Sequence, residues 1–468
     1  MAERLNPSPN IQLFSPSLLQ PFPMQPLVWK SLSASARSAA LQRPAQKAQK
    51  RTAVIVAGIL ALVRRGGDQA LRRITAKFDG VKLSSLRVSA AEFAAAEKSL
   101  KPADRAALRT AYRNLRKFHL AQRPVPVRVE TMPGLVCEKV SRPIERVGLY
   151  VPGGSAPLVS TALMLGVPSQ IAGNPVRVLC TPPGRDGKVS PWILIAARFC
   201  GITEVFKLGG AQAIAAMAYG TASVPKCDKL FGPGNSFVTE AKLQVSRDAA
   251  AIDLPAGPSE VMVIADNAAA PAFVAADLLS QAEHGPDSQE MLVAFSAKFA
   301  ARVETEVQNQ LALLPRGAIA TQALKKSRVL LAASPAEAVE IANRYAPEHL
   351  ILQVNDPRAL LPKITTSGSV FLGAWTPESL GDYASGTNHV LPTYGWARAC
   401  SGLGLTDFLR TMTVQTATAR GLRKLGPVVE RLALAENLAA HQRAVRVRLD
   451  ALSVAAVYDR RNNARRRS

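Results

Sequence analysis

Cysteine is scarce in this sequence, and its spacing excludes two common uses of the residue. Five cysteines occur among 468 residues, and no C-x-x-C pair is present. An odd, scattered set argues against a disulfide framework and against a zinc site built from thiolates. Free thiols suit a reducing compartment, so we expect the protein in the cytoplasm. The cysteines are Cys137, Cys180, Cys200, Cys227 and Cys400.

Long apolar runs are also missing. The longest, residues 53–63, contains Gly58 and is followed by Arg64 and Arg65. A membrane-spanning helix needs about 20 apolar residues, so we expect neither a membrane span nor a membrane partner. Residues 1–28 are rich in proline and are predicted to form a flexible extension. They lack the charged start and apolar core of a signal peptide.

Acidic residues are outnumbered, with 34 Asp and Glu against 58 Lys and Arg, for a formal net charge of +24. The basic residues are spread along the chain, except in a dense run at 460–467, and exposed aromatics do not alternate with them. We interpret this as a basic solvated surface followed by a tail at residues 457–468. A nucleic-acid-binding protein is the alternative class, and its binding would weaken steeply with salt.

Helical periodicity dominates the first part of the chain, at residues 53–65, 68–78 and 89–120. Four strand–glycine–helix units then follow one another, which predicts a parallel sheet with right-handed crossovers. Ligands of such sheets lie beyond the carboxyl ends of the strands, so Tyr150, Gln212 and Asn235 are candidates for nucleotide contact. No G-x-G-x-x-G is present, and tight turns of any α/β protein would look similar. The predicted strands are 147–151, 176–180, 204–208 and 229–231.

A second α/β section is predicted from residue 259 to about 372, and residues 426–452 carry apolar positions at helical spacing. Its strands are predicted at 259–265, 291–295, 328–331, 350–353 and 368–372, and its helices at 271–283, 297–313 and 335–344.

The polar stretch 381–392 fits neither helix nor strand periodicity, so we predict a loop. Loops at strand ends often carry function, and we expect Asp382 to bind a metal and His389 to face the same pocket. His119, by contrast, is interpreted as a surface or boundary histidine without a role.

Three further acid, amide and histidine groups stand out. Gln281 and His284 share a helix face, and Glu436 and His441 lie in the last helical region. Each histidine alone is more often structural, but together they offer the N and O donors of a zinc or manganese site. Glu348 and His349 are adjacent before a strand and suit proton transfer better than joint metal binding.

Seven segments, at 150–157, 209–215, 231–235, 255–260, 281–288, 347–350 and 381–392, resemble the histidinol dehydrogenase family, and the likeness runs from about residue 29 to about 452. This resemblance implies one zinc ion per subunit, with the last ligand supplied by the partner of a swapped homodimer. The implied ligands are Gln281, His284, Asp382 and His441.

The resemblance further implies substrate contacts by Ser259, Gln281, His284, His349, Asp382, His389, Glu436 and His441, and NAD contacts by Tyr150, Gln212 and Asn235. It implies that His349 takes the alcohol proton of L-histidinol while NAD accepts hydride. Glu348 then activates water on the bound aldehyde, and a second oxidation gives L-histidine. Relatives that oxidise other small polar alcohols, such as sulfonated diols, supply an alternative substrate.

The implied fold is α/β, with two incomplete Rossmann-like parallel-sheet domains and small helical terminal segments that complete the swapped homodimer. We predict a first α/β domain from 29–149 plus 261–403, a second, NAD-side domain at 150–260, and a helical arm at 404–456 that reaches the partner's site.

Overall fold

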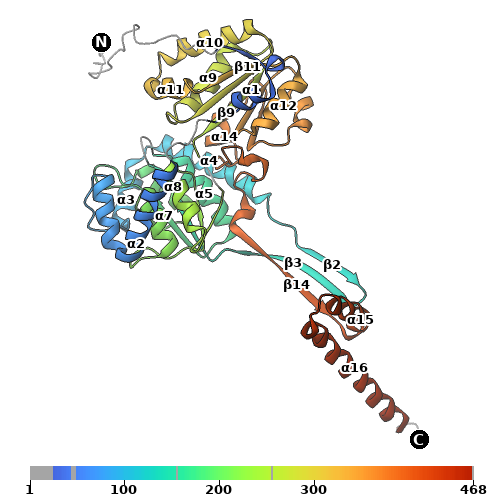
Figure 1. Cartoon of the computed structure of the whole chain (residues 1–468). Helices are drawn as coiled ribbons and strands as arrows, with labels where there is room; N and C mark the ends of the chain where they lie inside the picture. The colour runs from blue at the N-terminus through green and yellow to red at the C-terminus, as the bar shows by residue number, and fades with distance from the viewer. Residues whose placement is uncertain (1–24, 44–48, 154–156, 255–256, 466–468) are drawn as a thin grey trace. The chain divides into compact units, whose positions relative to one another are not determined.

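The computed structural model describes residues 25–43, 49–153, 157–254 and 257–465, and the predicted extension before residue 25 lies outside them. The chain divides into two units (Figure 1). Unit 1 comprises Met1–Ala121 and Glu145–Leu405, and unit 2 comprises Gln122–Ile144 and Thr406–Ser468. Among the described residues, no helix has both the length and the hydrophobicity needed to cross a membrane.

Unit 1 contains a six-stranded sheet in which every neighbouring pair is parallel. In spatial order its strands are β1 (Leu27–Val28), β11 (Arg328–Leu331), β10 (Gln289–Ala294), β9 (Glu260–Ala265), β12 (His349–Gln353) and β13 (Ser369–Leu372).

Helices cover both faces of this sheet, and the alternation of side chains along β9 decides what each face contacts. Val261 and Val263 pack with the helices α9, α10 and α11, while Met262 and Ile264 pack with α1, α12 and Trp29. Because both faces are covered, the strands read as continuous apolar runs. These helices (Figure 1) span α9 Pro271–Ala282, α10 Ala297–Leu311, α11 Gly317–Leu324, α1 Ala34–Ala40 and α12 Pro335–Tyr345.

A five-stranded sheet, also parallel throughout, forms the other core of unit 1. Its spatial order is β6 (Glu204–Lys207), β5 (Val176–Thr181), β4 (Arg146–Tyr150), β7 (Lys229–Phe231) and β8 (Ala251–Ile252). From β4 the chain adds β5 and β6 on one side of the sheet and then β7 and β8 on the other. The strand order therefore reverses between β4 and β7. Ligands of open α/β sheets bind at such a reversal.

The helices around the five-stranded sheet come partly from the start of the chain. Helix α2 packs with α7 and α8 in one buried core, and α3 packs with α6 and α4 with α5. Their bounds are α2 Gln49–Phe78, α3 Ala90–Ser99, α4 Pro102–Leu120, α5 Val159–Ala172, α6 Pro191–Phe199, α7 Gly210–Tyr219 and α8 Ser236–Val245.

The four predicted strand–glycine–helix units are present, with bounds within about two residues of the predicted ones. Domain membership differs from the sequence-based assignment. That assignment grouped 29–149 with 261–403, whereas α2 and β4 belong to the core and sheet formed by β4–β8. It also ended the extension at residue 28, whereas Leu27–Val28 forms the edge strand β1. Hydrophobic periodicity shows that a segment is buried but not which sheet it covers.

Unit 2 contains a three-stranded antiparallel sheet in the order β14-β3-β2, followed by the helices α15 (Ala419–Ala435) and α16 (Ala439–Arg465). Sequence analysis missed all three strands, because most of their side chains are exposed or only partly buried and give no clear apolar face. Asn437, with φ of 58°, separates the helices. The strands are β2 Val127–Met132, β3 Leu135–Pro143 and β14 Leu409–Ala417.

Short elements complete the chain: η2 Trp29–Ser31, α13 Pro357–Leu360, η3 Leu361–Lys363, α14 Glu378–Tyr383, η4 Trp396–Arg398 and η5 Leu405–Phe408.

Candidate active site

The pair Glu348–His349 lies at the amino end of β12, and both side chains are buried. The backbone of Glu260, the first residue of β9, holds both of them. The Glu260 N–H donates to Glu348 Oε2 at 2.8 Å, and His349 Nδ1 lies 3.1 Å from the Glu260 carbonyl oxygen. Since a carbonyl only accepts, Nδ1 carries a proton, and Nε2 is the nitrogen left to gain or lose one.

His349 Nε2 is buried and has no hydrogen-bond partner among the residues that the structure describes. The nearest acid is Asp382, whose Oδ1 lies 3.5 Å away. A buried nitrogen without a hydrogen bond is costly, which points to a ligand that binds at this atom.

Helix α9 brings the amide candidate to the same edge. A crossover helix runs antiparallel to its strands, so the last turn of α9 returns to the amino ends of β9 and β12. Gln281 lies in that turn and is fully buried. With its amide nitrogen facing Glu378, it donates to the two carboxylate oxygens at 2.5 and 3.1 Å. His284, just beyond the helix, is exposed.

Asp382 lies on helix α14, so the predicted loop at 381–392 was wrong at its start. The helix has six residues, too few to show periodicity. Gly381 is required by close packing rather than by a turn, since a Cβ there would lie 2.7 Å from the Phe371 ring. Glu378 and Asp382 are four residues apart and share a face of this helix.

His284, Glu378 and Asp382 offer ligand atoms that all lie within 4.8 Å of one another. Sequence analysis named His284 and Asp382 but missed Glu378, which is buried and also holds Gln281. Its signal was the i, i+4 spacing to Asp382, which the loop assignment concealed. Imidazole nitrogen and carboxylate oxygen are donors that suit zinc.

A cavity of about 1190 Å³ lies at the carboxyl ends of the five-stranded sheet. The three predicted nucleotide contacts, Tyr150, Gln212 and Asn235, all line it. The Tyr150 hydroxyl accepts from the Gly210 N–H at 3.0 Å, and burial raises the pKa of Tyr150 to about 12. Asn235 caps α8 by accepting from the backbone N–H groups of Phe237 and Val238. Two helix starts thus face the cavity, which suits phosphate groups.

A sequence model of the family described as histidinol dehydrogenase matches residues 41–449. The chain belongs to the histidinol dehydrogenase family. The histidinol dehydrogenase of Xanthomonas campestris pv. campestris (strain 8004) is 58% identical over 427 residues, which cover 91% of this chain and 99% of that protein. The histidinol dehydrogenase of Vibrio cholerae is 56% identical over 434 residues, covering 92% and 100%.

A crystal structure of histidinol dehydrogenase from Elizabethkingia anophelis is similar to this chain with a TM-score of 0.87 and 47% identity. The likeness covers 90% of this chain and 97% of that one. The α/β fold with parallel sheets is therefore the fold of the histidinol dehydrogenase family.

The remaining residues that the family resemblance singles out lie in varied surroundings. Ser259 is half-buried just before β9. His389 has both ring nitrogens engaged, with Nδ1 at 2.9 Å from the Asp382 carbonyl oxygen and Nε2 at 3.1 Å from Thr161 Oγ1. Glu436 and His441 lie in unit 2, at the end of α15 and on α16, and both are exposed. Their parts in the site stay predictions.

His119 is fully buried, so its interpretation as a surface or boundary histidine was wrong. Its Nδ1 lies 2.9 Å from the Leu115 carbonyl oxygen, and its Nε2 lies 3.4 Å from Asn388 Nδ2. Burial lowers the pKa of His119, which favours a neutral structural ring. Asn388 precedes His389 and donates to the Met164 carbonyl oxygen at 2.7 Å.

Crowded carboxylates dominate the electrostatics of the Glu348–His349 cluster. Burial raises the pKa of Glu348 to about 8, against the lowering effect of His349. Burial alone lowers the pKa of His349, but Glu378, Glu348 and Asp382 outweigh it and raise that pKa well above its ordinary value. Burial likewise raises the pKa of Glu378 well above normal. Acids packed this closely favour a bound cation, and its positive charge would lower the pKa values of Glu348 and His349 toward those of proton acceptors.

Proposed function

We propose that this protein is a zinc-dependent, NAD-linked dehydrogenase that oxidises L-histidinol through bound L-histidinaldehyde to L-histidine. These would be the last two steps of histidine biosynthesis, with the cytoplasm as the expected compartment. The observation that carries the proposal is the convergence of Glu348 and His349 with an amide, an imidazole and two carboxylates at one sheet edge.

The donor set at this edge fits a zinc ion. Gln281, His284 and Asp382 would hold it, together with His441 of the partner subunit. Because Glu378 accepts from the amide nitrogen of Gln281, the amide oxygen is left to face the ion. The bound ion would orient the substrate by taking its imidazole and amino nitrogens as ligands.

The cavity beside the five-stranded sheet is the proposed NAD site, with Tyr150, Gln212 and Asn235 as contacts. NAD would accept one hydride in each of the two oxidations. The volume of the cavity is of the order expected for a large ligand, since pockets for drug-sized molecules measure about 300–1,000 Å³.

In the first oxidation, His349 Nε2 takes the proton of the substrate alcohol. The Glu260 carbonyl fixes the ring by accepting from Nδ1. In the second, Glu348 orients water toward the aldehyde carbon and takes a proton as the hydrate forms. Glu348 Oε2 is held by the Glu260 N–H, so Oε1 is the oxygen that would accept a proton from that water. Burial of both residues limits side reactions of the bound aldehyde.

We further propose a swapped homodimer with one zinc per subunit, in which Glu436 and His441 of the partner subunit complete the substrate site together with Ser259 and His389. Unit 2 supports this, because apolar side chains on its helices and on the turn between them remain exposed in the single chain. Patches of this kind mark interfaces. They include Val428, Leu432, Leu434, Leu438, Val447 and Val454.

The deciding experiment counts NADH formed per histidinol consumed, with and without a chelator. Two NADH per histidinol and loss of activity on chelation are expected. A sulfonated diol serves as the comparison substrate. NAD reduction with the diol but not with histidinol would overturn the substrate assignment. Full activity after verified metal removal would overturn the zinc requirement.

A further inference from the structure

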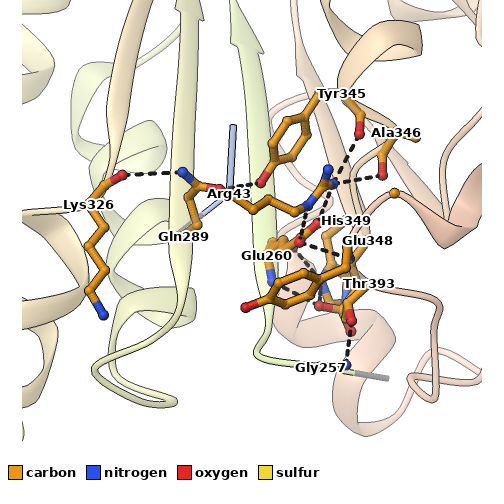
Figure 2. A network of polar contacts seen from close by, with 12 residues as sticks. Arg43, Gly257, Glu260, Gln289, Lys326, Tyr345, Ala346, Glu348, His349 and Thr393 are labelled. Carbon is orange, nitrogen blue, oxygen red and sulfur yellow. Dashed lines mark hydrogen bonds and ion pairs between the residues drawn. The ribbon is translucent and has the colours of Figure 1, made fainter. Parts of the chain in front are cut away.

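Glu260 connects the Glu348–His349 pair to the start of the chain (Figure 2). Its side chain is 2% exposed, and every polar atom of the residue is in use. The backbone N–H and carbonyl hold Glu348 and His349, as described above. The carboxylate is held in turn from the other side, by Arg43 and by the Tyr394 N–H, which donates to Oε1 at 2.9 Å.

Arg43 grips that carboxylate with two parallel hydrogen bonds, from Nε to Oε1 at 2.5 Å and from Nη2 to Oε2 at 2.8 Å. Nη2 also donates to the carbonyl oxygens of Tyr345 and Ala346, at 3.0 and 3.3 Å. The guanidinium carbon lies 4.0 Å from the centre of the Tyr345 ring. The Tyr345 hydroxyl in turn donates to Gln289 Oε1 at 2.8 Å (Figure 2).

This geometry fixes two strand starts at once. Glu260 opens β9, and Tyr345 and Ala346 end α12 immediately before Glu348 and β12. The Arg43 guanidinium therefore links Glu260, which holds both Glu348 and His349, to the end of α12, from which the chain continues into these two residues. A bidentate arginine–carboxylate pair sets direction as well as distance, which a lysine cannot do.

We propose that Arg43 and Glu260 are positioning residues that align Glu348 and His349 for both oxidations. This proposal rests on the proposed function of the same site. Neither residue needs to touch substrate. They act through the Glu260 peptide, whose N–H orients the Glu348 carboxylate and whose carbonyl selects the Nδ1–H tautomer of His349.

The segment that carries Arg43 is itself anchored in the six-stranded sheet. Leu27 and Val28 pair with β11. Trp29 is fully buried, and the guanidinium carbons of Arg37 and Arg344 lie 5.3 and 5.4 Å from the centre of its ring. The start of the chain thus contributes to the active-site geometry and not only to the core.

The test compares Arg43→Met, Arg43→Lys and wild type for kcat and KM with histidinol, and for thermal unfolding. Small misplacement of a reacting group can lower the rate roughly 10²-fold, so we expect kcat of Arg43→Met to fall by about that factor. KM should stay within about threefold, because the proposed substrate ligands are unchanged. Added guanidinium ion should restore part of kcat, and Arg43→Lys should lie between wild type and Arg43→Met.

Arg87→Met is the matched control, since Arg87 pairs with Glu204 in an exposed ion pair of unit 1. It should keep kcat and show no response to guanidinium. If Arg43→Met does not fold, Arg43→Lys carries the test. A kcat within twofold of wild type for the folded Arg43 variant, or a loss seen only as lower thermal stability, would overturn the positioning role. An inactive wild-type protein would instead overturn the proposed function itself.

Discussion

The two sheets of unit 1 present opposite kinds of edge. The five-stranded sheet opens a cavity of about 1190 Å³ at the carboxyl ends of its strands, with small residues such as Gly209 and Gly210 in its wall. The six-stranded sheet instead gathers buried acids and the buried imidazole of His349 at the amino ends of β9 and β12. The edge of the five-stranded sheet offers volume and backbone N–H donors. The edge of the six-stranded sheet offers charged groups and groups that can exchange protons.

This difference explains why the two edges serve different parts of the proposed reaction. A cofactor needs volume and N–H groups for phosphate, which a strand-order reversal supplies. Proton transfer needs groups with shifted pKa values, which burial and close carboxylates supply. The cost is electrostatic, since acids such as Glu348 and Glu378 are destabilised when ionised without a cation.

The largest expected effect is that of Glu348→Gln on the second oxidation. The amide keeps the hydrogen bond to the Glu260 N–H but cannot take a proton from water. Loss of a positioned base costs about 10²–10⁴ in rate, so aldehyde oxidation should fall by that factor while alcohol oxidation persists. The NADH released per histidinol should drop from two toward one. Undiminished conversion through to histidine would remove Glu348 from the second step.

Glu378→Gln tests whether the six-stranded edge is built for a cation. The substitution removes the carboxylate that accepts twice from the Gln281 amide. Groups that orient metal ligands are typically worth about 10–100-fold in affinity or activity, so zinc affinity measured by chelator competition should weaken by about that factor. Glu340→Gln, at an exposed acid of α12, is the control. Unchanged affinity in both variants would exclude Glu378 from the metal site.

Much of this comparison can be predicted from sequence, but only where the signal is local. The strands of both sheets, except β1 and β8, follow from short apolar runs in the sequence. Tyr150, Gln212 and Asn235 are candidates because they lie at or beyond the carboxyl ends of predicted strands. The Glu348–His349 pair is visible as adjacent residues before a strand. That position is the amino end of the strand, whereas the general rule for open sheets points to carboxyl ends and would not single it out as a site.

What could not be predicted depends on contacts between distant segments. Arg43 meets Glu260 across 217 positions of sequence, and no periodicity encodes that pairing. Glu378 was hidden in a helix of six residues. The strands of unit 2 carry mostly exposed or partly buried side chains, so they lack the alternation that marks a half-buried strand.

Glu290→Gln sharpens the contrast in charge between the two sheets. Glu290 lies on β10, and burial raises its pKa to about 7, against the lowering effect of its hydrogen bond with Ser327. The folded state therefore holds this proton more tightly than the unfolded chain, and wild-type stability should fall as pH rises from about 4.5 to about 7. Glu290→Gln should remove about 1–3 kcal/mol of that loss.

Denaturant unfolding at pH 5 and pH 8 measures the effect of Glu290→Gln. Glu340→Gln, at an exposed site, should leave the wild-type difference between the two pH values unchanged. If the stability of Glu290→Gln depends on pH in the same way as that of wild type, then ionisation of Glu290 in the folded state does not lower stability.

The smallest expected effect is that of Tyr150→Phe at the five-stranded edge. Loss of the hydroxyl leaves the Gly210 N–H without its acceptor in the cavity wall. An unmet hydrogen bond costs about 1 kcal/mol or more, so KM for NAD should rise at least roughly fivefold with little change in metal content. Tyr219→Phe, outside the cavity, is the control. An unchanged KM for NAD would argue against this cavity as the cofactor site.

The central claim is most directly tested by a crystal structure of the zinc-loaded protein with histidinol, using anomalous scattering at the zinc edge. The account predicts one zinc peak per subunit, bound by Gln281, His284 and Asp382 and by His441 of the partner subunit, with the substrate alcohol near His349 Nε2. A zinc peak elsewhere, or these side chains directed to separate places in every subunit arrangement, would contradict it.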